Sequence, residues 1–198
     1  MCWLYLLKDK SDAEQTFKNF HNMVKTQYST NIQILHTDNG KEYFNKILGE
    51  YLNKNRIVHQ SSYSNTPQQN GIIERKNKHL LEVARSIMFT TKTPKFFWRD
   101  AVLTACYLIN RMPTSVLNFQ TPINVFSKYF PENRIVSNLP LKFFGCTVFV
   151  HNHDPNRNKL DPRAFKCIFH GYVANQKGYK CYFPEKKELI VSMDVTFF

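Results

Sequence analysis

Two carboxylates in this sequence have the chemistry and setting that metal-dependent reactions of phosphodiesters require. Asp38 directly follows a short apolar run, and Glu74 comes after 35 intervening residues, near the start of a long basic segment with helical periodicity. Magnesium takes oxygen ligands, and two ions about 3.5–4 Å apart activate an attacking oxygen while they stabilise the leaving one. The pair therefore predicts a Mg²⁺ site that acts by positioning and charge compensation.

Each carboxylate alone also has an ordinary structural interpretation. Asp38 begins an Asp-Asn-Gly turn, where an aspartate commonly accepts a backbone hydrogen bond. Glu74 and Lys78 are four residues apart, a spacing typical of a helix surface ion pair. The combination favours chemistry because the strand-end carboxylate and the helix-borne glutamate are joined by a polar loop at 61–71.

The first part of the chain alternates predicted strands and helices. A possible capping box at Ser11 and Glu14 opens the first helix, and Pro94 is expected at the start of another. Alternation of this kind favours an α/β fold that contains parallel strand pairs. The predicted strands are 2–7, 32–37 and 57–60, and the predicted helices are 11–28, 46–55, 72–89 and 94–109.

The character of the chain changes after Pro113. A short helix is expected at 121–129, and the segment from 131 has the composition of a linker. From 141 onward, apolar runs separated by turn residues predict a small antiparallel sheet or barrel. The predicted domains are therefore 1–112, a helix and linker at 113–140, and a β domain at 141–198.

Composition narrows the classes of function. The net charge of +12 favours polyanionic partners, although a basic charge alone also suits an ordinary soluble protein. The five cysteines form no Cys-x-x-Cys pair, so we expect reduced, buried thiols. No apolar run reaches the roughly 20 residues of a membrane span, and no signal peptide is evident. We therefore expect an intracellular protein, nuclear or cytoplasmic, with no membrane partner.

Four segments together resemble a known family. They are Thr37–Phe44, Thr66–Arg75, Phe97–Arg111 and Lys159–Tyr172. The first two are similar to the integrase core of retrotransposon polyproteins, and the third resembles the Copia-type family in particular. The fourth resembles the small SH3-like domain that follows that core.

The resemblance implies a ribonuclease-H-like fold with an active site of two aspartates and a glutamate. Asp38 matches the second aspartate and Glu74 the glutamate, and together they would bind Mg²⁺ or Mn²⁺. The implied partner is DNA, with a basic position that touches the DNA end at Lys78. The residues expected to contact DNA are Asn39, Gln69, Asn70, Arg75, Lys78 and Arg85.

The resemblance also implies what this chain lacks. Residues 2–7 match the third strand of the family, so its first two strands and first catalytic aspartate have no counterpart here. Asp9 and Asp12 fall at a helix start, a location that explains them without a catalytic role. We therefore expect no strand transfer from this chain alone, and an unpaired edge at 32–37 that favours a homo-oligomer.

Two alternatives remain beside a DNA-integration lineage. One is a domesticated, non-catalytic nucleic-acid-binding protein, in which Asp38 and Glu74 are incidental. The other is a protein-interaction module, in which aromatic side chains of the β domain form a docking surface, although core packing is the more ordinary role for such residues. The aromatic residues in question are Tyr172, Tyr179, Tyr182 and Phe183.

Overall fold

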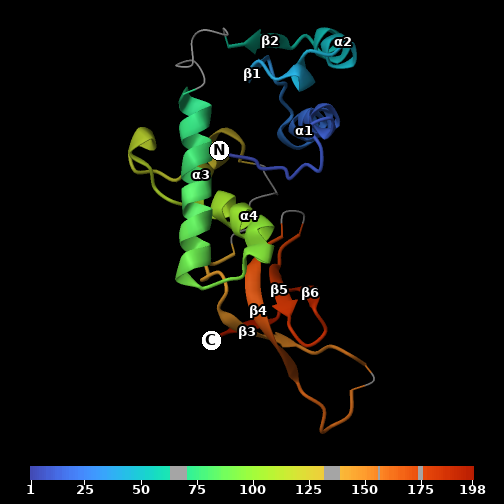
Figure 1. The fold of residues 1–198 in the computed structure, drawn as a ribbon, viewed down its shortest axis with the longest axis vertical. Helices are drawn as coiled ribbons and strands as arrows, with labels where there is room; N and C mark the ends of the chain where they lie inside the picture. Colours follow the sequence, from blue (N-terminus) through green and yellow to red (C-terminus); the bar gives the residue numbers. More distant parts are fainter. Residues whose placement is uncertain (63–70, 132–138, 156, 174–175) are drawn as a thin grey trace. The chain divides into compact units, whose positions relative to one another are not determined.

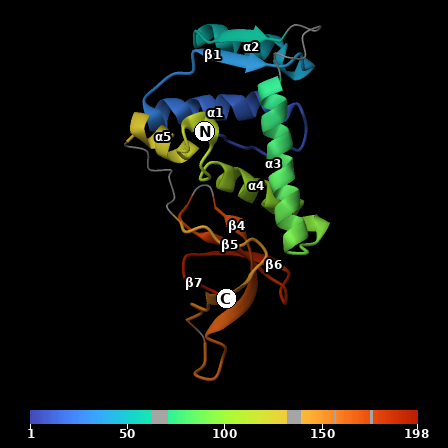
Figure 2. The ribbon, with the colours of Figure 1, turned by 90° about the vertical axis from the view of Figure 1, so that its left-hand side faces the viewer.

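The computed structural model describes residues 1–62, 71–131, 139–155, 157–173 and 176–198. Within it the chain forms two compact units, which Figures 1 and 2 trace from the N-terminus to the C-terminus. The N-terminal unit contains Leu4–Lys78 and Ser127–Arg134. The C-terminal unit contains Met1–Trp3, His79–Phe126 and Ile135–Phe198. The long helix α3 has residues in both.

The N-terminal unit is built on a pair of parallel strands. Strand β1 pairs with β2 in parallel, which confirms the arrangement expected from the strand and helix alternation. Its helices follow the predicted ranges to within one or two residues. The elements are α1 (Asp12–Tyr28), β1 (Ile34–Thr37), η1 (Lys41–Tyr43), α2 (Lys46–Lys54) and β2 (Val58–Ser61).

A small apolar core holds these elements together. Leu48 and Leu52 of α2 are almost fully buried with Ile57, and Phe17 of α1 and Leu35 of β1 pack against them. Helix α2 has a defined start because the Asn45 side chain accepts a hydrogen bond from the Leu48 amide at 2.7 Å. The capping box predicted for α1 does not form: Ser11 makes no side-chain cap, and Glu14 instead pairs with Lys18 at 2.6 Å.

The strand predicted at 2–7 is wrong. These residues have no assigned strand in the structure. The Cys2 amide donates to Asn110 Oδ1 at 2.8 Å, and the Cys2 carbonyl accepts from Asn110 Nδ2 at 2.7 Å. A strand requires a neighbouring backbone to satisfy its polar groups, and at Cys2 a side-chain amide takes that place. The apolar pattern predicted burial, but Tyr5, Leu6 and Leu7 are exposed, and no strand pairs with the segment.

The C-terminal unit combines helices with a five-stranded antiparallel sheet. The sheet order is β6-β5-β4-β3-β7, so the antiparallel sheet predicted for the C-terminal part of the chain is confirmed. The helical elements are α3 (Gly71–Thr90, of which this unit holds the part from His79), η3 (Lys95–Phe97), α4 (Trp98–Ile109), η4 (Ser115–Leu117) and α5 (Pro122–Tyr129, of which this unit holds the part up to Phe126). The strands are β3 (Thr147–His151), β4 (Ala164–Tyr172), β5 (Tyr179–Phe183), β6 (Glu188–Ser192) and β7 (Val195–Phe197).

Aromatic and apolar side chains fill the interior of this sheet. Val148, Phe169 and Cys181 are completely buried in its core. Tyr179 and Phe183 belong to the same buried cluster, while Tyr182 packs on Phe97 with ring centroids 4.9 Å apart. The aromatic docking surface considered above is therefore wrong for these residues, because core and inter-element packing use them. All five cysteines are free; Cys106, Cys167 and Cys181 are buried as expected, whereas Cys2 and Cys146 are only partly buried.

Helix α4 docks on strand β4 through both polar and aromatic contacts. Lys180 of β5 donates to Asp100 Oδ1 at 2.6 Å, and His170 Nδ1 lies 3.6 Å from Asp100 Oδ2. The rings of Tyr107 and Tyr172 stack with centroids 3.7 Å apart. The two segments that carry the Copia-type resemblance, 97–111 and 159–172, therefore contact each other directly.

This docking groups α4 with the β domain in one compact unit. The boundaries 1–112, 113–140 and 141–198 describe sequence character and stay a prediction about domains. The contacts divide the chain differently, because α4 packs on one face of β4 and buries it.

Gly171 makes the close approach of α4 and β4 possible. Its φ is +123°, and a Cβ built there would overlap Thr104 Oγ1 of α4. We predict that Gly171→Ala lowers the free energy of unfolding by more than about 2 kcal/mol, from backbone strain and overlap together. Thermal or urea unfolding measures this change.

Gly49→Ala is the matched control, because no atom lies within 4 Å of a Cβ placed on Gly49 in α2 and alanine is the better helix former. Adding Thr104→Ala to Gly171→Ala should restore part of the loss. Equal stability of Gly171→Ala and wild type would contradict the close approach.

Asp100 should make the stability of the chain sensitive to acid. Burial by itself would raise the pKa of this carboxyl, but His170 and Lys180 outweigh it, and the pKa is lowered from 3.8. A lowered folded-state pKa stabilises the fold above the ordinary value, and this contribution disappears as pH falls through the folded pKa. We predict that Asp100→Asn costs about 1.5–3 kcal/mol near neutral pH and progressively less below about pH 4.

Urea unfolding of both chains from pH 7 down to pH 3 tests this, with the exposed Asp9→Asn as control. A cost for Asp100→Asn that is independent of pH would show that the ionised carboxylate does not stabilise the docking.

Candidate nucleic-acid and metal interface

Asp38 lies at the carboxyl end of the parallel strand β1. It is exposed, while Thr37 before it is buried. Thr37 Oγ1 lies 2.8 Å from His59 Nε2 of β2, and Thr37 pairs in register with Ser61. The parallel ladder and this side-chain contact therefore hold the backbone from which the Asp38 carboxylate projects.

The carboxylate of Asp38 also accepts a hydrogen bond within the Asp-Asn-Gly turn. Oδ1 accepts a hydrogen bond from the Gly40 amide at 3.1 Å, so the structural interpretation of the Asp-Asn-Gly sequence is confirmed. A turn bond to one oxygen leaves the other oxygen and further lone pairs for a cation, so the two roles are compatible.

Glu42 adds negative charge beside this turn. A Cβ on Gly40 would lie 2.8 Å from the carboxyl carbon of Glu42, so the Glu42 carboxylate lies close to the Gly40 backbone. Burial raises the pKa of the neighbouring Tyr43 hydroxyl, and the charges of Asp38 and Glu42 raise it further. Sequence reasoning passed over Glu42, although its place four residues after Asp38 could have signalled it.

Glu74 and Arg75 lie on the exposed start of α3. Every residue from Ile72 to His79 is exposed, and burial begins only at Leu80. Ile73 has helical spacing with the buried residues Leu80 and Ala84, yet it is 54% exposed. Helical periodicity places a residue on one side of a helix but does not provide a core beneath it.

Glu74, Lys78 and Arg85 follow one side of α3, at spacings of four and seven residues. Lys78 and Arg85 are both exposed. A rise of 1.5 Å per residue separates them by about 10 Å along the helix axis, comparable with the rise of three nucleotides in one DNA strand. The helix therefore presents two cations with a spacing suited to a phosphate backbone.

The structure places only some of the predicted site residues near one another. Asp38 and Glu74 belong to the same compact unit, and Asn39 is exposed beside Asp38. Among the described residues, no group of three or more potential metal-ligating side chains includes either carboxylate. Gln69 and Asn70 lie outside the described residues, so their role stays a prediction. Within the described ranges, no helix has both the length and the apolarity to cross a bilayer.

The C-terminal part of the chain matches a known protein family. Residues 146–198 match the family model of the retroviral polymerase SH3-like domain. That range covers the whole five-stranded sheet, from β3 to β7. The C-terminal part of the chain is therefore an SH3-like domain.

Relatives extend over almost the whole chain. It is 41% identical over 195 residues to the retrovirus-related Pol polyprotein from transposon TNT 1-94 of Nicotiana tabacum, a match that covers 98% of this chain and 14% of that relative. The corresponding polyprotein from transposon RE1 of Arabidopsis thaliana is 35% identical over 98% of the chain and 13% of its own length. The transposon Ty1-DR6 Gag-Pol polyprotein of Saccharomyces cerevisiae is 26% identical, with 95% and 10% covered.

The chain is therefore related to the Copia-type retrotransposon Pol polyproteins. It spans about one seventh of the tobacco relative's length.

One solved structure shows a distant likeness. A chain in the simian T-cell lymphotropic virus intasome, in complex with PP2A regulatory subunit B56 gamma, has a TM-score of 0.47 and 13% identity. The match covers 96% of this chain and 65% of that chain. This score is too low to establish a common fold.

Proposed function

We propose that this chain is the part of an integrase-lineage protein that binds DNA along α3 and contributes Asp38 and Glu74 to a metal site. The observation that supports this most strongly is the placement of Glu74, Lys78 and Arg85 on the exposed side of α3, in a chain related to retrotransposon Pol polyproteins. Strand transfer at a DNA end uses a metal ligand together with cations that bind phosphates, and this side of the helix offers both.

Binding to DNA follows from charge and its arrangement. The net charge of +12 creates a field that attracts a polyanion and releases its counterions on contact. Lys78 and Arg85 place two of these charges at a spacing that matches phosphates about three nucleotides apart in one strand, and Arg75 adds a cation on the next side of the helix. Contacts with phosphates position a protein without reading sequence, so these residues set affinity and orientation.

The metal site is proposed for Mg²⁺ or Mn²⁺. Asp38 and Glu74 are both exposed carboxylates, and hard oxygen ligands fit these ions. A divalent ion bound there supplies activation of the attacking oxygen and neutralises the charge on the phosphate. We infer that the N-terminal unit is a ribonuclease-H-like core, supported by the parallel β1–β2 pair with Asp38 at its carboxyl end.

We predict that Lys78→Gln combined with Arg85→Gln weakens DNA binding and flattens its salt dependence. Each lost phosphate contact removes about 0.9 from the slope of log K against log salt, so the double variant should lose about 1.8. Fluorescence anisotropy with a labelled duplex, titrated at several salt concentrations, measures the slope directly.

A control that removes the same charge elsewhere separates placement from net charge. Lys46 on α2 and Lys76 on α3 are both exposed, and Lys76 lies two residues from Glu74 and Lys78, away from their side of the helix. Lys46→Gln combined with Lys76→Gln should leave the slope nearly unchanged. Equal slopes for the two double variants would refute recognition by the Lys78 and Arg85 side.

We also predict that the 198-residue chain assayed by itself carries out neither strand transfer nor disintegration with Mn²⁺. Two-metal catalysis depends on carboxylates that hold both ions, and no three-member ligand group in the described residues contains Asp38 or Glu74. The assay uses a pre-joined DNA substrate and the Asp38→Asn chain as control. Turnover that disappears in Asp38→Asn would show that the chain completes its own metal site.

A further inference from the structure

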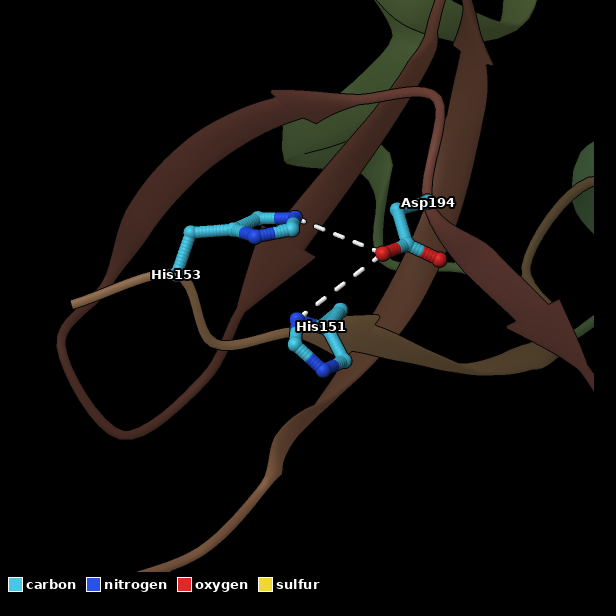
Figure 3. Close-up of side chains that lie close together, drawn as sticks. All are labelled: His151, His153 and Asp194. Atoms are coloured by element: carbon cyan, nitrogen blue, oxygen red, sulfur yellow. Dashed lines mark ion pairs between the residues drawn. The ribbon is translucent and has the colours of Figure 1, made fainter. Parts of the chain in front are cut away.

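His151, His153 and Asp194 form a cluster in the SH3-like domain, distinct from Asp38 and Glu74. One potential ligand atom from each residue lies within 4.8 Å of the other two. Figure 3 shows both imidazole rings directed toward the same carboxylate. His153 Nε2 lies 3.3 Å from Asp194 Oδ2, and His151 Nδ1 lies 3.8 Å from that oxygen.

The backbone holds each of the three residues in place. His151 ends β3, and its amide donates to the Asp194 carbonyl at 3.1 Å. The Asp194 amide in turn donates to Ser192 Oγ at 3.0 Å. On the other side of His153, the Asp154 amide donates to Asn152 Oδ1 at 3.0 Å. The cluster therefore joins the end of β3 to the turn between β6 and β7 through fixed main-chain positions.

The distances suit a small tetrahedral cation. Ligand atoms about 2.0–2.1 Å from zinc at tetrahedral angles lie roughly 3.3–3.4 Å from each other. The nitrogen–oxygen separations of 3.3 and 3.8 Å are close to this value, and one nitrogen of each imidazole lies within 4.8 Å of the other, so side-chain rotations that bring the two rings together would complete the site. All three side chains are exposed, from 45% to 68%, so an ion reaches them without opening the fold.

We propose that His151, His153 and Asp194 bind Zn²⁺, with His151 Nδ1, His153 Nε2 and an Asp194 oxygen as ligands. Two imidazoles and a carboxylate are a donor set typical of zinc, whereas Mg²⁺ takes an all-oxygen set. Three protein ligands leave one coordination position for water or for a ligand from outside the chain. The ion would link the end of β3 to the β6–β7 turn and so restrain this end of the β3–β7 strand pair.

Ion pairing without metal is the competing explanation. An imidazolium beside Asp194 would account for the same distances without any cation, and such exposed pairs contribute little to stability. The two explanations differ in one respect: only the zinc site binds a metal ion.

The test is calorimetric titration of the untagged full chain with Zn²⁺ in the presence of a reductant. It is performed on the Asp38→Asn, Glu74→Gln background, so that failure of the integrase-lineage site cannot produce or remove the signal. We expect one equivalent of Zn²⁺ whose affinity falls at least about tenfold in His153→Gln and in Asp194→Asn. Imidazole resonances of His151 and His153 should shift on binding in the parent chain.

His79→Gln is the matched control, since His79 is an exposed histidine on α3 outside the cluster. Its isotherm should equal that of the parent. Saturation with Mg²⁺ should leave the His151 and His153 resonances in place. No zinc binding by the parent, or the same isotherm in the parent and in His153→Gln, would overturn the proposal.

Discussion

A buried carboxylate joins the helical part of the C-terminal unit to its sheet. Asp100 of α4 is 7% exposed and accepts from Lys180 of β5, with His170 of β4 beside it. A charge removed from water is tolerated only where partners compensate it, so this contact specifies one arrangement of α4 against the sheet. Gly171 permits the close approach, and the stacked rings of Tyr107 and Tyr172 extend it. The burial of β4 depends on this docking.

The residues that stabilise the C-terminal unit differ from those proposed to bind DNA or zinc. Residues that hold the C-terminal unit together are buried or paired, as with Tyr172, whose pKa burial raises to about 12. The residues proposed to contact DNA lie on the exposed side of α3. Those proposed to bind zinc lie at the end of β3 and in the turn between β6 and β7. A side chain that must reach a phosphate or a metal ion has to remain accessible, so it contributes little packing. Substitutions at these positions are therefore expected to change binding while they leave the fold intact.

Local pattern predicted most of the elements. The helices α1, α2, α3, α4 and α5 lie close to their expected ranges, and the chain after 141 forms the expected antiparallel sheet, because hydrophobic periodicity reports the face that a segment buries. Predictions that required a partner were less successful. The segment 2–7 had the composition of a strand but no strand pairing, and Ile73 had the spacing of a core residue without a core beside it. Periodicity identifies an apolar face and does not identify what covers it.

The sequence alone determined the relationship to Copia-type Pol polyproteins and predicted a metal site at Asp38 and Glu74, because both inferences rest on residue types and their spacing along the chain. It also indicated why Asp38 lies at a strand end, since strand and turn signals are local. Only the tertiary structure showed that the 97–111 and 159–172 segments contact each other, and that Asp194 lies beside His151 and His153. These contacts join residues tens of positions apart, and strand pairing and side-chain packing determine them. A short stretch of sequence specifies neither the strand pairing nor the side-chain packing.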